Sequence, residues 1–292
     1  MSSSTHKIIT TAIALMLVVA AVANGETTTV FSRVSEDQQL RPLALQMAIV
    51  TYAPTDSGKD FSVDLISAIH IGDRAYYADL NNRFSDYDAL LYELIAPEGA
   101  EILQADDRRD GILSTTQLGM TKLLGLTFQL DEIEYDKANL VHADLSPEEL
   151  RQSMAERDES LYVYFWRIFF ASVDEYAKDP LGIKDWQLLS TMLESGRGNS
   201  MKTMIAYEMT NMDKVRDIFG EDSNSAIIGA RNQRVIEVLQ DQLASGAKRI
   251  GIFYGVAHMQ DIEARLLETV GLTYQKTVWV DAWRLGHAPT NQ

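Results

Sequence analysis

The sequence predicts an α+β or α/β fold, in which a central mixed sheet is built from N- and C-terminal strand segments and flanked by helices. Two observations lead to this prediction. Short apolar runs of strand length occur between residues 45 and 95 and again between 250 and 283, with Gly, Pro, Asp or Ser at their boundaries. Residues 137–222 between them are mostly helical in composition, which indicates a helical middle insertion.

Composition places the chain among ordinary globular proteins. Of its 292 residues, 46% are hydrophobic and 23% are charged. A formal net charge of −16 argues against nucleic-acid binding, which needs clustered Lys and Arg, and would favour cations, although such charge usually serves solubility. The chain has no cysteine, which excludes disulfides, thiolate metal sites and a cysteine nucleophile.

The N-terminus has the pattern of a signal peptide over residues 1–25. A short segment ending at Lys7 precedes an apolar run of 16 residues, 8–23, and small residues at 21–23 suit cleavage. No cysteine follows, so a lipoprotein anchor is excluded. The alternative is an uncleaved anchor, but the run is short for a membrane span. We therefore expect an exported protein, periplasmic or secreted, with no membrane span after cleavage.

The first strands are predicted to form a hairpin. Residues 26–44 are polar and are expected to form a loose leader before a single domain over 45–286. Leu45–Ala53 reads as a strand, residues 54–58 as a turn, and Phe61–Ile71 as the returning strand. A helix is expected to follow over Asp73–Phe84.

The region after this hairpin is predicted to alternate between strand and helix. The expected elements are a buried strand over 87–95, a helix over 111–126, a strand over 128–136 and an irregular segment over 139–144. Ser146 is a good helix N-cap, because Pro147 follows it and Glu149 stands three residues after it.

The C-terminal part is predicted to be helix, strand, helix and strand. A long helix over 223–245 should end at Gly246, because glycine favours the helix C-terminus. A buried strand then starts at Ile250, a helix covers 259–270 and a strand covers 272–283, before a tail at 287–292.

Two histidines lie at equivalent places in this pattern. His70 ends one predicted buried strand, and His258 follows another, three residues after Gly255. Ligands bind outside the carboxyl ends of strands in open α/β sheets, so both histidines are expected to face one pocket. Each histidine taken alone is more often structural.

Glu93 and Arg231 are the charged residues least easily explained as surface groups. Glu93 lies inside an apolar run, where a carboxylate normally pairs or binds metal; the alternative is an edge strand with Glu93 facing solvent. Arg231 falls within the apolar stripe of its helix, which predicts an oxyanion or substrate contact or, equally, a core salt bridge to an acidic residue.

His142 is a weaker candidate for the same site. It stands close to Asp144, and the two together suggest a substrate contact, while the alternative is a histidine bonded to backbone. The sequence contains no Gly-x-Ser-x-Gly, no phosphate-binding loop and no His-Glu-x-x-His, so the common hydrolase and nucleotide-hydrolase signatures are absent.

The order and spacing of these residues resemble the TraB/Tiki family, which belongs to a superfamily with ChaN-like haem-binding and erythromycin-esterase-like proteins. That family has two Gly-x-x-His motifs, a glutamate after the first and a helical Arg-Asn before the second. Gly255-Val-Ala-His258, Glu93 and Arg231-Asn232 match these motifs. The first motif reads Ser67-Ala-Ile-His70, with serine in place of glycine.

The resemblance implies a metal-dependent hydrolase, specifically a peptidase, with a peptide or small-molecule substrate. His70 and His258 would hold a divalent metal, Glu93 would be a third ligand or the base that activates water, and Arg231 would contact the oxyanion or a substrate carboxylate. Asn232 and His142 would contact the substrate. Nitrogen and oxygen ligands suit manganese, cobalt or zinc without choosing among them.

The main alternative is a non-catalytic protein that binds a peptide, haem or another small ligand in the same cleft, as the ChaN-like relatives and the altered first motif suggest. An esterase-like enzyme is a third possibility. The sequence indicates no particular oligomeric state.

Overall fold

The computed structural model describes residues 29–56, 58–96, 125–157, 197–210 and 225–285, and for 197–201 the backbone only. The described residues from Phe31 onward belong to one structural unit. The predicted signal peptide, the predicted helix over 111–126 and most of the predicted helical middle lie outside the described residues. No helix in the described ranges is long and apolar enough to span a bilayer.

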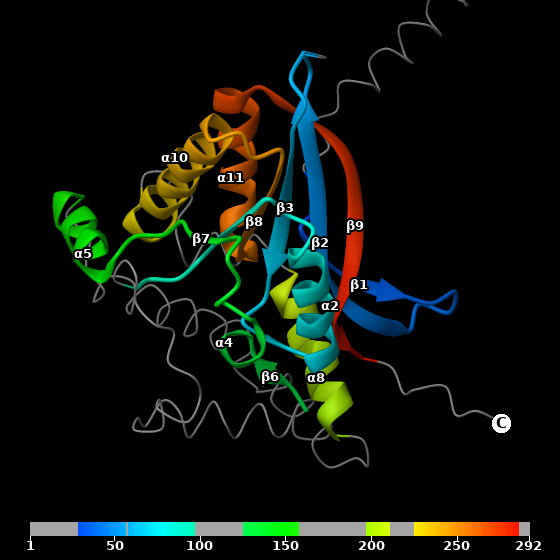
Figure 1. Cartoon of the computed structure of the whole chain (residues 1–292). Coiled ribbons are helices and arrows are strands. Elements are labelled where there is room, and N and C mark those ends of the chain that lie inside the picture. The colour runs from blue at the N-terminus through cyan, green and yellow to red at the C-terminus, as the bar shows by residue number, and fades with distance from the viewer. Residues whose placement is uncertain (1–28, 57, 97–124, 158–196, 211–224, 286–292) are drawn as a thin grey trace, which may run out of the picture. The chain divides into compact units, whose positions relative to one another are not determined.

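A mixed sheet of seven strands organises this unit and confirms the predicted fold class (Figure 1). Its order is β1-β2-β3-β8-β5-β7, and β9 also pairs with β2. The pairs β3–β8, β8–β5 and β5–β7 are parallel, whereas β2 pairs antiparallel with β1, β3 and β9. The strands are β1 (Ser32–Glu36), β2 (Pro42–Pro54), β3 (Ser62–Ala68), β5 (Ala89–Tyr92), β7 (Leu140–His142), β8 (Arg249–Gly255) and β9 (Leu272–Arg284).

The predicted hairpin is confirmed, but its second strand is shorter than expected. Strands β2 and β3 pair antiparallel, with Ile49 opposite Ile66. Strand β3 ends at Ala68, and the chain bends before Ile71–Gly72, which forms β4 in a separate two-stranded sheet with β6 (Thr127–Phe128). The bend places His70 in the loop between the two sheets.

Residues 26–44 are not only a loose leader, so that prediction was wrong. Strand β1 lies within this segment and pairs with β2, and Phe31 just before it is buried. The segment has few apolar residues because β1 lies beside β2 at one end of the sheet order, where polar side chains remain partly exposed.

Two further predictions around residue 130 were wrong. The predicted strand over 128–136 is instead the end of β6 followed by the short helix α4 (Gln129–Glu132). The segment expected to be irregular, 139–144, contains β7, whose Leu140 pairs with Leu90 of β5. A three-residue strand depends on its partner strand for stability, so its own sequence gives little signal.

Helices cover both faces of the sheet. Besides α4, the described α-helices are α2 (Arg74–Phe84), α5 (Pro147–Glu156), α8 (Arg197–Met209), α10 (Arg231–Ala244) and α11 (Met259–Arg265). Short helical turns adjoin them at η2 (Ala226–Ala230), η3 (Val256–His258) and η4 (Leu266–Val270). The predicted long helix over 223–245 is thus η2 continued by α10, capped by Ser225 and ended before Gly246, whose φ of 93° suits glycine. The predicted capping box at Ser146 is also confirmed.

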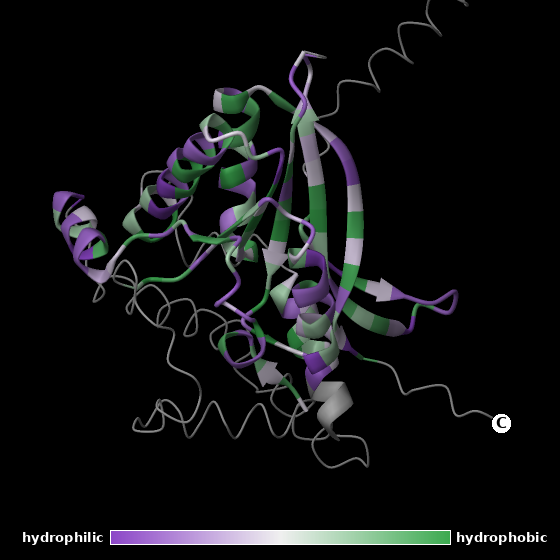
Figure 2. Cartoon of the chain, in the orientation of Figure 1, coloured by the Kyte–Doolittle hydropathy of each residue, from purple (hydrophilic) through white to green (hydrophobic). Residues whose placement is uncertain are grey.

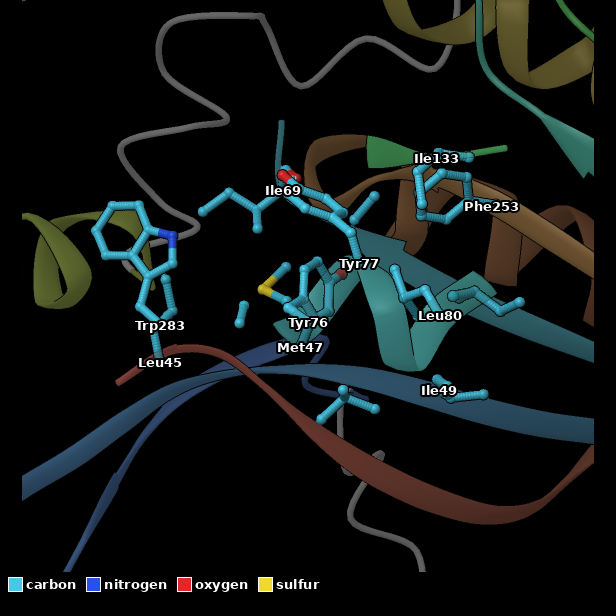
Figure 3. Close-up of a cluster of buried hydrophobic side chains, with 14 of the residues drawn as sticks. Leu45, Met47, Ile49, Ile69, Tyr76, Tyr77, Leu80, Ile133, Phe253 and Trp283 are labelled. Carbon is cyan, nitrogen blue, oxygen red and sulfur yellow. Dashed lines mark hydrogen bonds between the residues drawn. The ribbon is translucent and has the colours of Figure 1, made fainter. Parts of the chain in front are cut away.

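The core lies on both sides of the sheet, and the hydropathy pattern follows it (Figure 2). One cluster packs α2 against β2, β8 and β9, and includes Tyr76, Tyr77 and Trp283 (Figure 3). The hydroxyl of Tyr77 donates to the Ile69 carbonyl at 2.9 Å, and Nε1 of Trp283 donates to the Ile71 carbonyl at 2.6 Å. These bonds satisfy buried polar groups and hold the backbone on both sides of His70.

Candidate functional site

The candidate site lies where three adjacent parallel strands end. Glu93 directly follows β5, His258 follows β8 through one helical turn, and His70 follows β3. All three approach Gly255 at the end of β8. A Cβ atom added to Gly255 would lie 3.2 Å from Oε2 of Glu93, 3.6 Å from Nε2 of His70 and 3.9 Å from Cδ2 of His258. The chain therefore brings these three predicted site residues together, and the missing side chain at Gly255 leaves room for them.

Glu93 is buried, and β5 lies between β8 and β7. The solvent-facing edge alternative is therefore wrong, since only 11% of the Glu93 side chain is exposed. Its Oε2 accepts a hydrogen bond from the Gly255 amide at 2.6 Å, and its Oε1 accepts one from Nη2 of Arg231 at 2.7 Å. Burial raises the pKa of Glu93, but the positive charge that His258 carries in acid and that of Arg231 outweigh it and lower the pKa to about 2. Glu93 is thus ionised at neutral pH.

Arg231 is the first residue of α10 and points into the core. Its Nε and Nη2 donate to the two carboxylate oxygens of Asp144 at 2.8 and 2.6 Å, in a bidentate ion pair. Nη2 also donates to Glu93, and Nη1 lies 3.3 Å from Nε2 of His258. Burial lowers the pKa of Arg231, whereas Asp144 and Glu93 raise it by more. Of the two sequence alternatives, the structure contains the core salt bridge: three N–H groups of Arg231 contact the carboxylates of Asp144 and Glu93, and a fourth faces His258.

His258 is buried against Asn232 and the ring of Tyr254. Its Nδ1 lies 2.6 Å from Oδ1 of Asn232, and its ring meets that of Tyr254 edge-on, with 5.3 Å between centroids. Nε2 lies 3.6 Å from Oε1 of Glu93. Burial lowers the pKa of His258 to about 4, because it removes water from the charged form. At neutral pH the ring is neutral, as a general base or metal ligand must be.

His70 is the exposed member of the group. Its Nδ1 lies 3.2 Å from Oε1 of Gln129, whose amide donates to the hydroxyl of Tyr135 at 2.8 Å. Gln129 is the first residue of α4, which lies in the segment that was predicted to be a strand. The contact between Gln129 and His70 was therefore missed, and no local pattern around residue 129 signals it.

The two predicted substrate contacts have other partners. Asn232 is fully buried, and its amide contacts His258 and Asp261, so it supports the histidine. Nε2 of His142 lies 2.6 Å from the Leu94 carbonyl, and its ring packs on Tyr92. This is the backbone-bonded alternative considered for His142, and its described contacts do not include the residues around Gly255.

Two acidic residues that the site depends on were missed or undervalued. Asp144 was considered only as a companion of His142, whereas its carboxylate is completely buried against Arg231. Asp261 received no role, although its Oδ2 accepts a hydrogen bond from the Asn232 amide at 2.8 Å. A signal for Asp261 existed, because positions 258 and 261 are one helical turn apart and share a face.

Ser67 stands where the resemblance expects glycine, and its side chain is 1% exposed in β3 opposite Tyr254. In the described part of the chain, its hydroxyl has no hydrogen-bond partner. The strand accommodates this side chain without a backbone irregularity.

Within the described ranges, no group of three or more His, Asp or Glu side chains is arranged to hold one metal ion. Comparison of the chain with protein-family models, curated proteins and solved structures found no match.

Proposed function

We propose that this chain is an exported hydrolase of the TraB/Tiki type that uses a divalent metal ion to cleave peptide bonds. One observation carries the proposal. An ionised carboxylate and a neutral buried imidazole, with a second imidazole beside them, meet at the shared end of three parallel strands. These are the groups that water activation requires, at the place where α/β sheets bind ligands.

The donor groups suit a divalent ion in chemistry and in charge, although the described side chains would have to move to hold one ion together. Asp144 neutralises Arg231, which leaves the negative charge of Glu93 to attract a cation. Nδ1 of His258 is held by Asn232, so Nε2 is the nitrogen that faces Glu93. Because Nε2 also accepts from Arg231, the contact of 3.3 Å between them must open when Nε2 binds a metal. His258, Glu93 and His70 would then be the ligands.

The roles of the side chains follow from these contacts. A divalent ion would lower the pKa of a bound water molecule and polarise the substrate carbonyl. Where Glu93 is not itself a metal ligand, it would accept the proton from water, because it is ionised and is held in place by the Gly255 amide and Arg231. Arg231 holds Glu93, and one N–H group of its Nη1, which has no partner among the described residues, would contact an oxyanion or a substrate carboxylate.

The second candidate is a non-catalytic protein that binds a peptide, haem or another small ligand at the same strand ends. The observation in its favour is that Arg231 already occupies Oε1 of Glu93 and Nε2 of His258. An arginine held in this way can pair with a carboxylate of a bound ligand without any metal.

One experiment separates the two candidates. The purified chain is incubated with a peptide mixture under manganese, cobalt or zinc, with and without chelator, and products are identified by mass spectrometry. Chelator-sensitive cleavage that disappears in Glu93→Gln supports the hydrolase. Absence of cleavage under every metal, together with saturable binding of peptide or haem, would reject the hydrolase in favour of the binding protein.

A further inference from the structure

A chain of polar contacts links His258 to a carboxylate one helical turn away on α11. Oδ1 of Asn232 lies 2.6 Å from Nδ1 of His258, and Nδ2 of Asn232 donates to Oδ2 of Asp261 at 2.8 Å and to the His258 carbonyl at 3.3 Å. Asn232 is fully buried, and His258 is nearly so. Contacts of this kind are well ordered, because each buried polar group has few other partners.

These contacts determine which ring nitrogen carries the proton. The nitrogen of the Asn232 amide faces two acceptor oxygens, so the oxygen of the amide must face the ring. An amide oxygen only accepts, and Nδ1 of His258 must therefore donate. The contact at Nε2 supports the same assignment. Nη1 of Arg231 lies 3.3 Å from Nε2, and because an arginine only donates, Nε2 must accept. His258 thus carries its proton on Nδ1, and its free electron pair is on Nε2.

Asp261 is the group that prevents the amide from turning over. With the Asn232 amide reversed, its oxygen would lie 2.8 Å from a carboxylate oxygen of Asp261, and two acceptors would repel one another. The Asp261 carboxylate is held in turn by Nε of Arg265, which donates to the same oxygen at 2.6 Å. A second donor of Arg265 reaches Gln233, the neighbour of Asn232 on α10.

We propose that Asp261 is a positioning residue: through the Asn232 amide it keeps His258 protonated on Nδ1, so that the electron pair of Nε2 faces Glu93 and the reacting groups. The tautomer assignment stands on the contacts alone, whereas its consequence for turnover rests on the proposed function. Asp261 touches neither the ring nor Glu93 in the described contacts, and it acts only through Asn232.

The direct test is the nitrogen spectrum of His258 in the full-length chain. Nitrogen-15 labelling of histidine distinguishes Nδ1–H from Nε2–H rings, and His258→Gln identifies the signal among the five histidines. We expect an Nδ1–H ring in the parent chain at pH 7 and a measurable Nε2–H population in Asp261→Ala, limited by the His258 carbonyl and Arg231, which still favour Nδ1–H. Asp261→Asn keeps an acceptor oxygen and should retain Nδ1–H. An Nε2–H ring in the parent chain, or an unchanged spectrum in Asp261→Ala, would overturn the proposal.

The matched control is Asp79→Ala. Asp79 pairs with Arg83 four residues later on α2, at 2.8 Å, as Asp261 pairs with Arg265 on α11, but its contacts in the described part of the chain do not include Asn232. It should leave the His258 spectrum unchanged. If Asp261→Ala does not fold, Asp261→Ser takes its place, since its shorter side chain does not reach the amide and should give the same change of tautomer.

Peptide hydrolysis supplies a second readout. Loss of such an orienting partner typically lowers activity by about 10–100-fold. We expect this loss in kcat for Asp261→Ala with little change in KM, and a smaller loss for Asp261→Asn. If the parent chain hydrolyses nothing under any metal, the proposed function fails, while the tautomer spectra still decide the role of Asp261.

Discussion

Asp144→Ala should be the most destabilising single change at the candidate site. The Asp144 carboxylate is completely buried and makes two charge-assisted hydrogen bonds, at 2.8 and 2.6 Å, to the buried guanidinium of Arg231. Removing one partner of a buried ion pair typically costs about 3–5 kcal/mol, because the other charge stays buried without compensation. Glu93 remains beside Arg231 as a counter-charge. The expected loss in the free energy of unfolding is therefore at the lower end of this range, about 3 kcal/mol.

Urea unfolding followed by circular dichroism measures this loss as a decrease in the transition midpoint. For a chain of this size, a loss of about 3 kcal/mol corresponds to a melting temperature roughly 6–12 °C lower. Asp144→Asn keeps the shape of the side chain and one acceptor oxygen, so it should lower the free energy of unfolding by about half as much as Asp144→Ala. Glu148→Ala breaks an exposed ion pair with Arg151 and should change stability by no more than about 0.5 kcal/mol. A loss below about 1 kcal/mol for Asp144→Ala would refute the reasoning, because Arg231 would then not depend on Asp144.

Three further predictions concern the same group. His258→Ala should abolish both metal uptake, measured by isothermal titration calorimetry with manganese, and peptide hydrolysis; retention of either contradicts the assignment. The pKa of His258 falls from 6.5 to about 4 on folding. Between these pH values the unfolded chain therefore binds one more proton at His258 than the folded chain, and the free energy of unfolding should rise with pH by roughly 3 kcal/mol. Urea midpoints at pH 4.5 and 7 measure this rise, and an equal rise in His258→Gln would exclude His258 as its source. Gly255→Ala should lower hydrolysis at least tenfold with a stability loss of only about 1 kcal/mol, because its Cβ would meet Glu93 without backbone strain. Gly251→Ala, whose Cβ would lie 2.5 Å from Cδ1 of Leu90 inside the sheet, should instead lower stability more than hydrolysis.

The sequence predicts the centre of this site because one rule of sheet geometry applies to it. Parallel strands end at the same edge, so residues that follow them become neighbours however far apart they are in the chain. His258 was expected to follow a buried apolar run, and it does. Glu93 was expected inside a strand over 87–95, but β5 ends at Tyr92, so the strand pattern alone did not predict its contact with His258. The apolar stripe of its helix predicts that Arg231 is buried. The stripe does not distinguish a substrate contact from a core salt bridge, because the partner, Asp144, is distant in the sequence.

The parts of the fold and of the site that the sequence does not predict depend on partner segments that are distant in the sequence. Strand β7 has three residues and is stable because β5 pairs with it, and α4 follows β6, which pairs with β4. Neither has a periodic pattern long enough to predict. Asp144 follows β7, so missing that strand also hid the reason why its carboxylate is buried.

The charges around Arg231 explain how one buried arginine is compatible with a cation site. Glu93 and Asp144 contribute two negative charges, Arg231 contributes one positive charge, and His258 is neutral at pH 7, so the group carries a net charge of −1. Asp144→Asn removes one negative charge and leaves Glu93 as the only counter-charge of Arg231. The field that attracts a divalent ion then disappears, although every proposed ligand is still present. Asp144→Asn should therefore weaken manganese binding at least tenfold, measured by calorimetry at a temperature where the variant is folded. Unchanged affinity would mean that the ion binds elsewhere. The ion pairs of Arg231 with Glu93 and Asp144 would then serve only to hold α10 against the strand ends.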